Sequence, residues 1–265
     1  MTASRPLCLI TGASSGIGAD LAHCAAADGF DLVLVARRMT ALSHVAQQCE
    51  REHKVRVTII PADLGDPMAS RVLQAELRSR QLDVHTLINN AGLGASGRVV
   101  DLSVEVQLNL LQVNVVALTD LTRRLLPAMI ERRTGAVMNV ASTAAFLPGP
   151  GMAAYYASKA YVLSFTEALG EELRGTGVQV SALCPGPTET EFAAVAGVSN
   201  HKLFKQRSML MSPAVVARQG WEGLLAGQRV VVPGWRNRLL TQSLRIAPRA
   251  IVARVSASLN ASGET

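Results

Sequence analysis

The sequence is short of the features that identify membrane-spanning, disulfide-rich and disordered proteins. Its 265 residues contain no uninterrupted apolar run near the roughly 18 residues that a spanning helix needs. Only four cysteines are present, without C-x-x-C spacing, so they indicate reduced thiols rather than a metal site or a disulfide scaffold: Cys8, Cys24, Cys49 and Cys184. Charged residues make up only 17% of the chain and apolar residues 49%, which excludes disorder and provides a sizeable core.

The N-terminus is expected to form a strand rather than a signal peptide. The N-terminus has one arginine and a short apolar run that ends in glycines, which is typical of a first strand. Together with the reduced thiols, this pattern predicts a cytoplasmic protein. No Pro-, Gly- or Ser-rich linker divides the chain and no period repeats, so we expect a single domain.

The net charge of +6 is unevenly distributed. Residues 201–265 carry ten Lys or Arg against two Glu, whereas residues 1–200 carry 16 basic against 18 acidic side chains. A basic tail suits an anionic substrate, a membrane surface or nucleic acid, and a solvated face is the alternative. Nucleic acid is the least favoured, because no recognition motif accompanies the charge. Within the tail, 237–259 is apolar and basic, and we expect a helix that is broken or kinked near Pro248. We favour packing of this segment on the body or on a partner subunit over a membrane-surface helix.

Apolar, β-branched runs alternate with segments whose apolar residues recur every three or four positions. The strand candidates are 6–11, 31–36, 55–61, 84–89, 136–141, 178–184 and 229–232. The helix candidates are 17–27, 40–52, 67–80, 104–132, 154–174 and 213–226. This alternation predicts an α/β fold, a doubly wound (Rossmann) parallel sheet of about seven strands with helices on both faces.

The first expected strand runs directly into a glycine-rich turn, TGASSGIG, and a helix follows. The glycines let the backbone turn sharply and approach a pyrophosphate closely, while the start of the helix offers free N–H groups and the serines add hydroxyl donors. Such a turn can be purely structural, but its place in the first strand–helix unit favours nucleotide binding. The residues expected to bind are Gly12, Ser14, Ser15, Gly16, Ile17 and Gly18.

The residues that follow the second and third expected strands indicate which nucleotide binds. Ala36 stands where an NAD site would place an acid for the ribose 2′-hydroxyl, and Arg37 and Arg38 follow it. Because a guanidinium pairs with phosphate through a fixed fork of donors, this predicts NADP(H), with Arg37 on the 2′-phosphate. A solvated Arg37, and an Arg38 stacked on the adenine, are the alternatives. Asp63, followed by Leu64, can accept from the adenine amino group or simply lie near a helix start.

Ser142, Tyr155 and Lys159 are the candidates for chemistry. Tyr155 and Lys159 are four residues apart in an expected helix, so both lie on one face. A nearby ammonium stabilises a phenolate, so we expect the pKa of Tyr155 to fall below its usual value of about 10 and the pair to act as a general acid–base. Ser142 ends the fifth strand at the carboxyl edge, where its hydroxyl can donate to a carbonyl oxygen. By spacing alone, a Tyr–Lys pair is usually structural.

Taken together, these residues resemble the short-chain dehydrogenase/reductase family in its single-domain branch, from residue 6 to about 233. The motifs that carry the resemblance are TGASSGIG at 11–18, Asp63-Leu64, NNAG at 89–92, Asn114, Ser142, YYASK at 155–159 and PGPTET at 185–190. The glycine pattern differs from that of longer, epimerase-like relatives. The resemblance implies strand order 3-2-1-4-5-6-7, a Rossmann-fold NADP-binding and catalytic domain over 1–235, and a basic, apolar C-terminal extension of it over 236–265.

The resemblance also implies a role for each matched residue. Tyr155 matches the catalytic tyrosine, Ser142 the carbonyl-polarising serine, and Lys159 the lysine that also holds the nicotinamide ribose. Asn114 matches an asparagine that supports a water and the lysine in a proton relay. Tyr156 has no lysine four residues later, so we expect it to pack or to line the pocket. The remaining expected cofactor residues are Asn90, Ala91, Gly92, Pro185, Gly186, Thr188 and Thr190, with a structural brace as the alternative for NNAG.

These features predict an NADP(H)-dependent oxidoreductase, homo-oligomeric and without a metal, that transfers a hydride between nicotinamide and a carbonyl or alcohol carbon. The substrate is expected to be apolar, because the expected pocket walls 94–97, 144–152 and 192–211 are mainly apolar. Their candidates are Phe146, Leu147, Pro148, Met152, Phe192, Leu203, Phe204, Met209, Leu210 and Met211. Two alternatives stay open: a non-catalytic NADP(H)-binding regulator, and a membrane-surface, lipid-modifying reductase that uses the basic tail.

Overall fold

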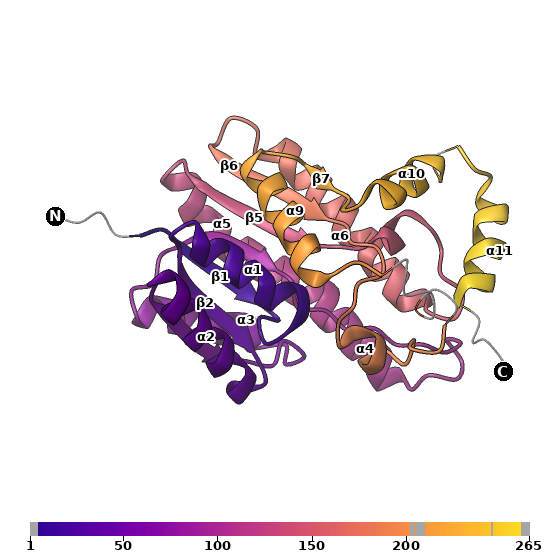
Figure 1. Ribbon diagram of the computed structural model, residues 1–265, viewed down its shortest axis with the longest axis horizontal. Coiled ribbons are helices and arrows are strands. Elements are labelled where there is room, and N and C mark those ends of the chain that lie inside the picture. The colour runs from indigo at the N-terminus through magenta and orange to yellow at the C-terminus, as the bar shows by residue number, and fades with distance from the viewer. Residues whose placement is uncertain (1–4, 202–203, 205–209, 245, 261–265) are drawn as a thin grey trace.

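The structure, a computed structural model, describes residues 5–201, 204, 210–244 and 246–260. Seven parallel strands form one sheet in the order β3-β2-β1-β4-β5-β6-β7 (Figure 1). The strands are β1 Leu7–Thr11, β2 Asp31–Ala36, β3 Val57–Pro61, β4 Val84–Asn89, β5 Gly135–Val140, β6 Val178–Leu183 and β7 Val230–Val231. The predicted doubly wound fold and its strand order are therefore confirmed.

Helices cover both faces of the sheet. The longer ones are α1 Gly16–Ala27, α2 Met39–His53, α3 Ala69–Ser79, α4 Val104–Leu111, α5 Leu118–Glu131, α6 Ala153–Glu172, α9 Pro213–Leu225, α10 Trp235–Ser243 and α11 Arg249–Asn260. Shorter turns of helix are η1 Gln112–Ala117, η2 Thr143–Phe146 and α7 Phe192–Val195. Buried side chains of α1, α2 and α9 share one core cluster, and those of α3, α5 and α6 share the other.

Alternation along the strands explains the two cores. On β1, Cys8 and Ile10 belong to the core under α1, whereas Leu7 and Leu9 belong to the opposite core. Successive side chains of a strand point to opposite faces, so a strand covered on both sides must be apolar at every position. This is why the continuous apolar runs in the sequence correctly located the central strands.

Three predicted elements differ from the structure. The expected helix over 104–132 is interrupted by η1, a π-helical turn that carries Asn114. The expected helix over 67–80 begins only at Ala69, and the strand expected over 229–232 is reduced to two residues. A single π turn shifts the apolar spacing by only about one residue, and the three- and four-residue spacing over a long segment does not resolve such a shift.

The C-terminal segment forms two helices, so the helix expected over 237–259 is broken near Pro248, one of the two predicted forms. Pro248 lies immediately before α11, where its missing N–H costs nothing. Figure 1 shows both helices at the opposite end of the molecule from α2. The Tyr156 hydroxyl donates to Asn260 Oδ1 (3.0 Å), and Asn260 Nδ2 donates to the carbonyl of Pro150 (3.1 Å), which fastens α11 to the body. Among the helices in the described ranges, none has the length and apolarity needed to cross a bilayer.

Candidate active site

One cavity of about 530 Å³ brings most of the predicted site residues together at the carboxyl edge of the sheet. The predicted residues that line it are Gly12, Ser14, Ser15, Gly16, Ile17, Gly18, Arg37, Arg38, Asp63, Leu64, Asn90, Ala91, Gly92, Ser142, Tyr155, Lys159, Pro185, Gly186, Thr188 and Thr190. Asn114 is buried behind the lining. The motifs that were recognised separately in the sequence thus face one shared space.

Backbone conformation and close packing explain why glycine occupies three positions of the turn. Gly12 and Gly16 have φ of +65° and +55°, a region that side chains with a Cβ rarely adopt. A Cβ on Gly18 would lie 2.4 Å from Asn90 Nδ2, so the helix start packs directly on the turn after β4. Asn90 Nδ2 donates to the carbonyls of Thr11 (2.9 Å) and Gly12 (3.2 Å). The Asn90 side chain therefore braces the glycine turn, as its structural alternative predicted, while the residue still lines the cavity.

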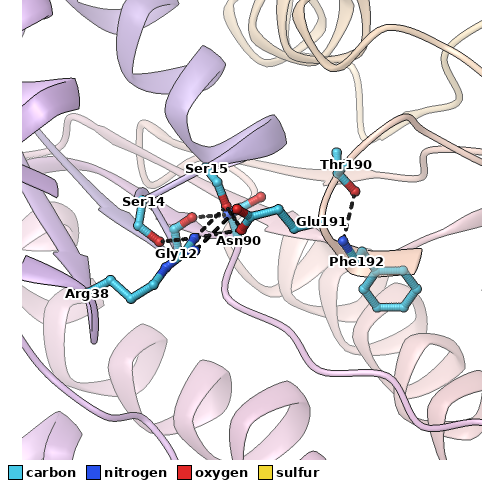
Figure 2. A network of polar contacts seen from close by, with 8 residues as sticks. All are labelled: Gly12, Ser14, Ser15, Arg38, Asn90, Thr190, Glu191 and Phe192. Carbon is cyan, nitrogen blue, oxygen red and sulfur yellow. Dashed lines mark hydrogen bonds and ion pairs between the residues drawn. The ribbon is translucent and has the colours of Figure 1, made fainter. Parts of the chain in front are cut away.

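Arg38 is the centre of a polar network across the glycine turn (Figure 2). Its guanidinium donates to both carboxylate oxygens of Glu191, at 3.2 and 2.6 Å, and to the hydroxyls of Ser14 (3.2 Å) and Ser15 (3.0 Å). The Ser15 hydroxyl itself donates to Glu191 Oε2 (2.8 Å). Glu191 follows β6 by eight residues and was not among the predicted site residues, because nothing in its local sequence distinguishes it from other surface acids.

Arg37 and Asp63 lie at the same end of the cavity, and both are exposed. Asp63 Oδ1 accepts from the N–H of Gly65 (3.0 Å), a local turn contact that leaves its other oxygen free for a ligand. Guanidiniums, serine hydroxyls and the N–H groups at the start of α1 form a donor set that suits an anionic nucleotide.

Ser142, Tyr155 and Lys159 lie at the other end of the cavity. Ser142 follows β5, and its Oγ accepts from the N–H of Ala144 (3.1 Å). Tyr155 and Lys159 are buried on the same face of α6, with Lys159 Nζ 5.9 Å from the centre of the Tyr155 ring. Lys159 Nζ donates to the carbonyl of Val140 (2.8 Å), which uses one of its three donors.

The pKa of Tyr155 moves in the opposite direction to the prediction. Burial raises the pKa of Tyr155 to about 12, partly opposed by the hydrogen bond with Ser142. Burial also lowers the pKa of Lys159 to about 8, so the ammonium itself is disfavoured at this depth. The loss of hydration on burial is the largest cause of the Tyr155 shift, and the four-residue spacing of the two groups does not report it.

Asn114 and the turn after β6 complete the surroundings. Asn114 Oδ1 accepts from the N–H of Leu93 (2.8 Å), and its Nδ2 donates to the Leu93 carbonyl (2.9 Å) and to Ser158 Oγ (3.0 Å). A Cβ on Gly92 would lie 3.3 Å from Lys159 Nζ and 3.5 Å from Asn114 Oδ1, so both groups approach the same glycine. Asn114 lies in the π-helical turn η1, and π turns inside α-helices often occur at functional sites.

The turn after β6 is held beside Ser142 and the glycine turn by backbone contacts. Pro185 O accepts from the N–H of Thr143 (2.8 Å), and Thr188 Oγ1 donates to the carbonyl of Gly186 (2.9 Å). A Cβ on Gly16 would lie 2.9 Å from Thr190 Cγ2, so this turn also lies directly on the glycine turn.

The pocket walls agree in part with the prediction. Leu147, Met152, Phe192 and Phe204 line the cavity as expected. Phe146 and Met211 pack instead against two core clusters. Pro148 and Leu210 do not line the cavity. Leu203 and Met209 are outside the described residues. The C-terminal helices supply lining that the sequence did not predict: Asn237, Leu240, Ser256, Leu259 and Asn260. No local pattern signals this contribution, because it depends on where α10 and α11 pack.

Known proteins resemble this chain in sequence and in overall fold. A family model described as short chain dehydrogenase matches residues 6–199. Sulfoacetaldehyde reductase 2 of Chromohalobacter salexigens is 38% identical over 189 residues, which is 71% of this chain and 74% of that protein. A short-chain dehydrogenase from Sphingobium yanoikuyae, solved in complex with NADPH, has a TM-score of 0.81 and 34% identity over 91% of this chain and 94% of that one. A bulky-bulky ketone specific alcohol dehydrogenase from Comamonas testosteroni has a TM-score of 0.77 and 30% identity, and covers 91% of this chain and 92% of its own.

Proposed function

The chain belongs to the short chain dehydrogenase family of NAD(P)-dependent oxidoreductases, and we propose that it uses NADP(H) to interconvert a carbonyl and an alcohol on an apolar small molecule. The observation that carries this proposal is a single cavity with a nucleotide-type donor set at one end and Ser142, Tyr155 and Lys159 at the other. That combination argues against a non-catalytic regulator, which would need only the first set.

The proposed cofactor is NADP(H) rather than NAD(H). Arg37 and Arg38 both line the cavity beyond Ala36, where an acidic residue would select the ribose 2′-hydroxyl. Two guanidiniums supply charge-assisted donors for a 2′-phosphate. The NADPH bound in the Sphingobium relative supports the same choice.

In this proposal the cofactor supplies the hydride, and the side chains of this chain orient the substrate and move its proton. During reduction, Ser142 and Tyr155 hydrogen-bond the carbonyl oxygen, and Tyr155 donates its proton to that oxygen. A pKa of about 12 keeps the phenol protonated near neutral pH, which suits a proton donor. One N–H of Lys159 is used by the carbonyl of Val140, so two N–H donors remain for the nicotinamide ribose. Asn114 supports a water and Lys159 in the relay that returns a proton to Tyr155.

The substrate is proposed to be apolar, because Leu147, Met152, Phe192, Leu240 and Leu259 line the cavity. The decisive experiment is a panel of ketones, aldehydes and alcohols of increasing size, assayed with NADPH, NADH and their oxidised forms and followed by identification of the product. Turnover of bulky apolar carbonyls with NADPH supports the proposal. Binding of NADPH without turnover of any panel member would favour the regulator instead.

Exposed apolar side chains on the C-terminal helices support a second candidate, the same reaction at an anionic membrane surface. Trp235, Leu239 and Ile251 are 67%, 62% and 55% exposed, and Arg236 and Arg254 lie beside them in the sequence. Sedimentation with anionic and neutral liposomes at several salt concentrations separates this candidate from a free enzyme. Salt-sensitive binding to the anionic vesicles alone supports it.

We further propose a cytoplasmic homo-oligomer. All four cysteines are free thiols, which suits a reducing compartment. The exposed apolar side chains Val104 and Leu108, four residues apart on α4, offer a face for a second copy of the chain. Light scattering coupled to size-exclusion chromatography tests the oligomer directly.

A further inference from the structure

The Glu191 carboxylate lies where the glycine turn, α1 and the end of β2 meet. Three groups hold it: the two terminal nitrogens of Arg38 and the hydroxyl of Ser15 (Figure 2). Ser15 is also the residue at the N-cap of α1, and its hydroxyl makes no capping bond to that helix. The first turn of α1 contains no acidic residue of its own, so Glu191, 176 positions away in the chain, supplies the negative charge at this helix start.

We propose that Glu191 is an affinity-setting residue that competes with a cofactor phosphate for Arg38 and Ser15. This inference rests on the proposed function, because the competing phosphate belongs to the proposed nicotinamide cofactor. The donors at issue are the Arg38 guanidinium and the Ser15 hydroxyl, which Glu191 now holds. A carboxylate and a phosphate both bind a guanidinium through a two-oxygen fork. Glu191 occupies the fork formed by the two terminal nitrogens of Arg38, so a phosphate cannot bind that same fork while Glu191 holds it.

The exposure of the pair determines how strong the competition is. The Arg38 and Glu191 side chains are 53% and 55% exposed. Exposed ion pairs contribute little to stability because water screens them, so a bound phosphate can replace this one at small cost. Both partners nevertheless stay charged, because the contact lowers the pKa of Glu191 and raises that of Arg38.

The position of the loop makes Glu191 a direct competitor rather than a distant charge. Thr190, its neighbour, lies directly on Gly16 of the glycine turn. The loop that carries Glu191 therefore covers the same turn that the proposed function assigns to the cofactor, and Glu191 also lines the cavity.

The test is the equilibrium binding of NADPH and NADH to the full-length protein, measured by titration calorimetry for the wild type and Glu191→Gln. The substitution keeps the size of the side chain and removes its charge. We expect NADPH to bind about two- to five-fold more tightly, the range that corresponds to an exposed ion pair. Tightening of NADPH alone assigns the competing anion to the 2′-phosphate, and equal tightening of NADH assigns it to the pyrophosphate.

Glu189→Gln is the matched control, because Glu189 is exposed two residues earlier and lies outside the cavity lining. Unchanged or weaker NADPH binding in Glu191→Gln would overturn the inference, as would equal tightening in Glu189→Gln. In an Arg38→Gln background the effect of Glu191→Gln should largely disappear, and its full retention would also overturn the inference. A wild type that binds neither nucleotide would instead refute the proposed function.

Discussion

The two ends of the cavity are built in different ways. The end beneath Arg38 comes mainly from the first two strand–helix units, where the glycine turn and the end of β2 are separated by fewer than about 30 residues, the size of one such unit. The other end is assembled from distant segments: the turn before Tyr155, the loop at Phe192 and the helices α10 and α11. A local motif thus supplies most of the first end, to which a distant loop adds Glu191, whereas tertiary packing brings together the segments of the second end. If the two ends are functionally separate, a substitution at one end should leave the properties of the other end unchanged.

The largest effect is expected at Tyr155. Tyr155→Phe removes the proton donor while it keeps the ring, so turnover should fall by about 10²- to 10⁴-fold, the usual contribution of a general acid. NADPH affinity should change little, because most of the proposed nucleotide donors are at the other end and Lys159 keeps its own. Steady-state kinetics and titration calorimetry on the same preparation measure both quantities.

Tyr156→Phe is the control for that substitution, since it removes the hydroxyl of the neighbouring ring. It should reduce turnover far less. Substantial turnover by Tyr155→Phe, or equal losses in both variants, would remove Tyr155 from the assigned role.

The next effect concerns the choice of cofactor. A charge-assisted contact is worth about 1.5–3 kcal/mol, so loss of Arg37 should reduce the preference for NADPH by roughly 10- to 150-fold. Ala36→Asp should reverse the preference, because a carboxylate repels the 2′-phosphate and accepts from a 2′-hydroxyl. The measurement is kcat/KM for NADPH and NADH in the wild type, Arg37→Ala and Ala36→Asp.

Arg71→Ala, on the surface of α3 and outside the cavity lining, is a matched control for the loss of one arginine. Equal damage to both nucleotides in Arg37→Ala, or a wild type that does not prefer NADPH, would show that Arg37 does not recognise the phosphate.

A smaller effect is expected where α11 joins the pocket. Asn260→Ala leaves the buried Tyr156 hydroxyl and the Pro150 carbonyl without their partner, which should cost about 1–3 kcal/mol of unfolding free energy. We expect a lower melting temperature and a higher KM for apolar substrates with NADPH affinity unchanged. Ser258→Ala, on the exposed side of α11, should alter none of these. A parallel loss of NADPH affinity in Asn260→Ala would contradict the separation of the two ends.

The smallest effect is in the pH dependence. Lys159, with a pKa of about 8, is protonated below that pH and loses its charge above it. If the ammonium holds the ribose, kcat/KM for reduction should fall by about four-fold between pH 7 and pH 8.5. A profile that stays flat to pH 9, with the fold intact by circular dichroism, would argue that the charge of Lys159 is not needed.

Composition, periodicity and local motifs were sufficient for most of the central fold. Strands such as β2 are apolar at every position because both faces are covered, and a glycine turn after β1 needs φ values that few residues tolerate. These requirements act over a few residues, so the local sequence pattern is sufficient to predict the strands and the turn. The order of the strands and the roles of Ser142, Tyr155 and Lys159 came instead from resemblance to a family.

Only the tertiary structure revealed the contacts between distant segments. Glu191 reaches Arg38 across 153 positions, and Asn260 reaches Tyr156 across 104. It also decided the direction of the Tyr155 pKa, since desolvation depends on everything packed around a group and not on its partner four residues away. Sequence alone determined which chemical groups the chain carries and which short turns they occupy. Burial and long-range packing, which no local spacing encodes, decided what those groups touch.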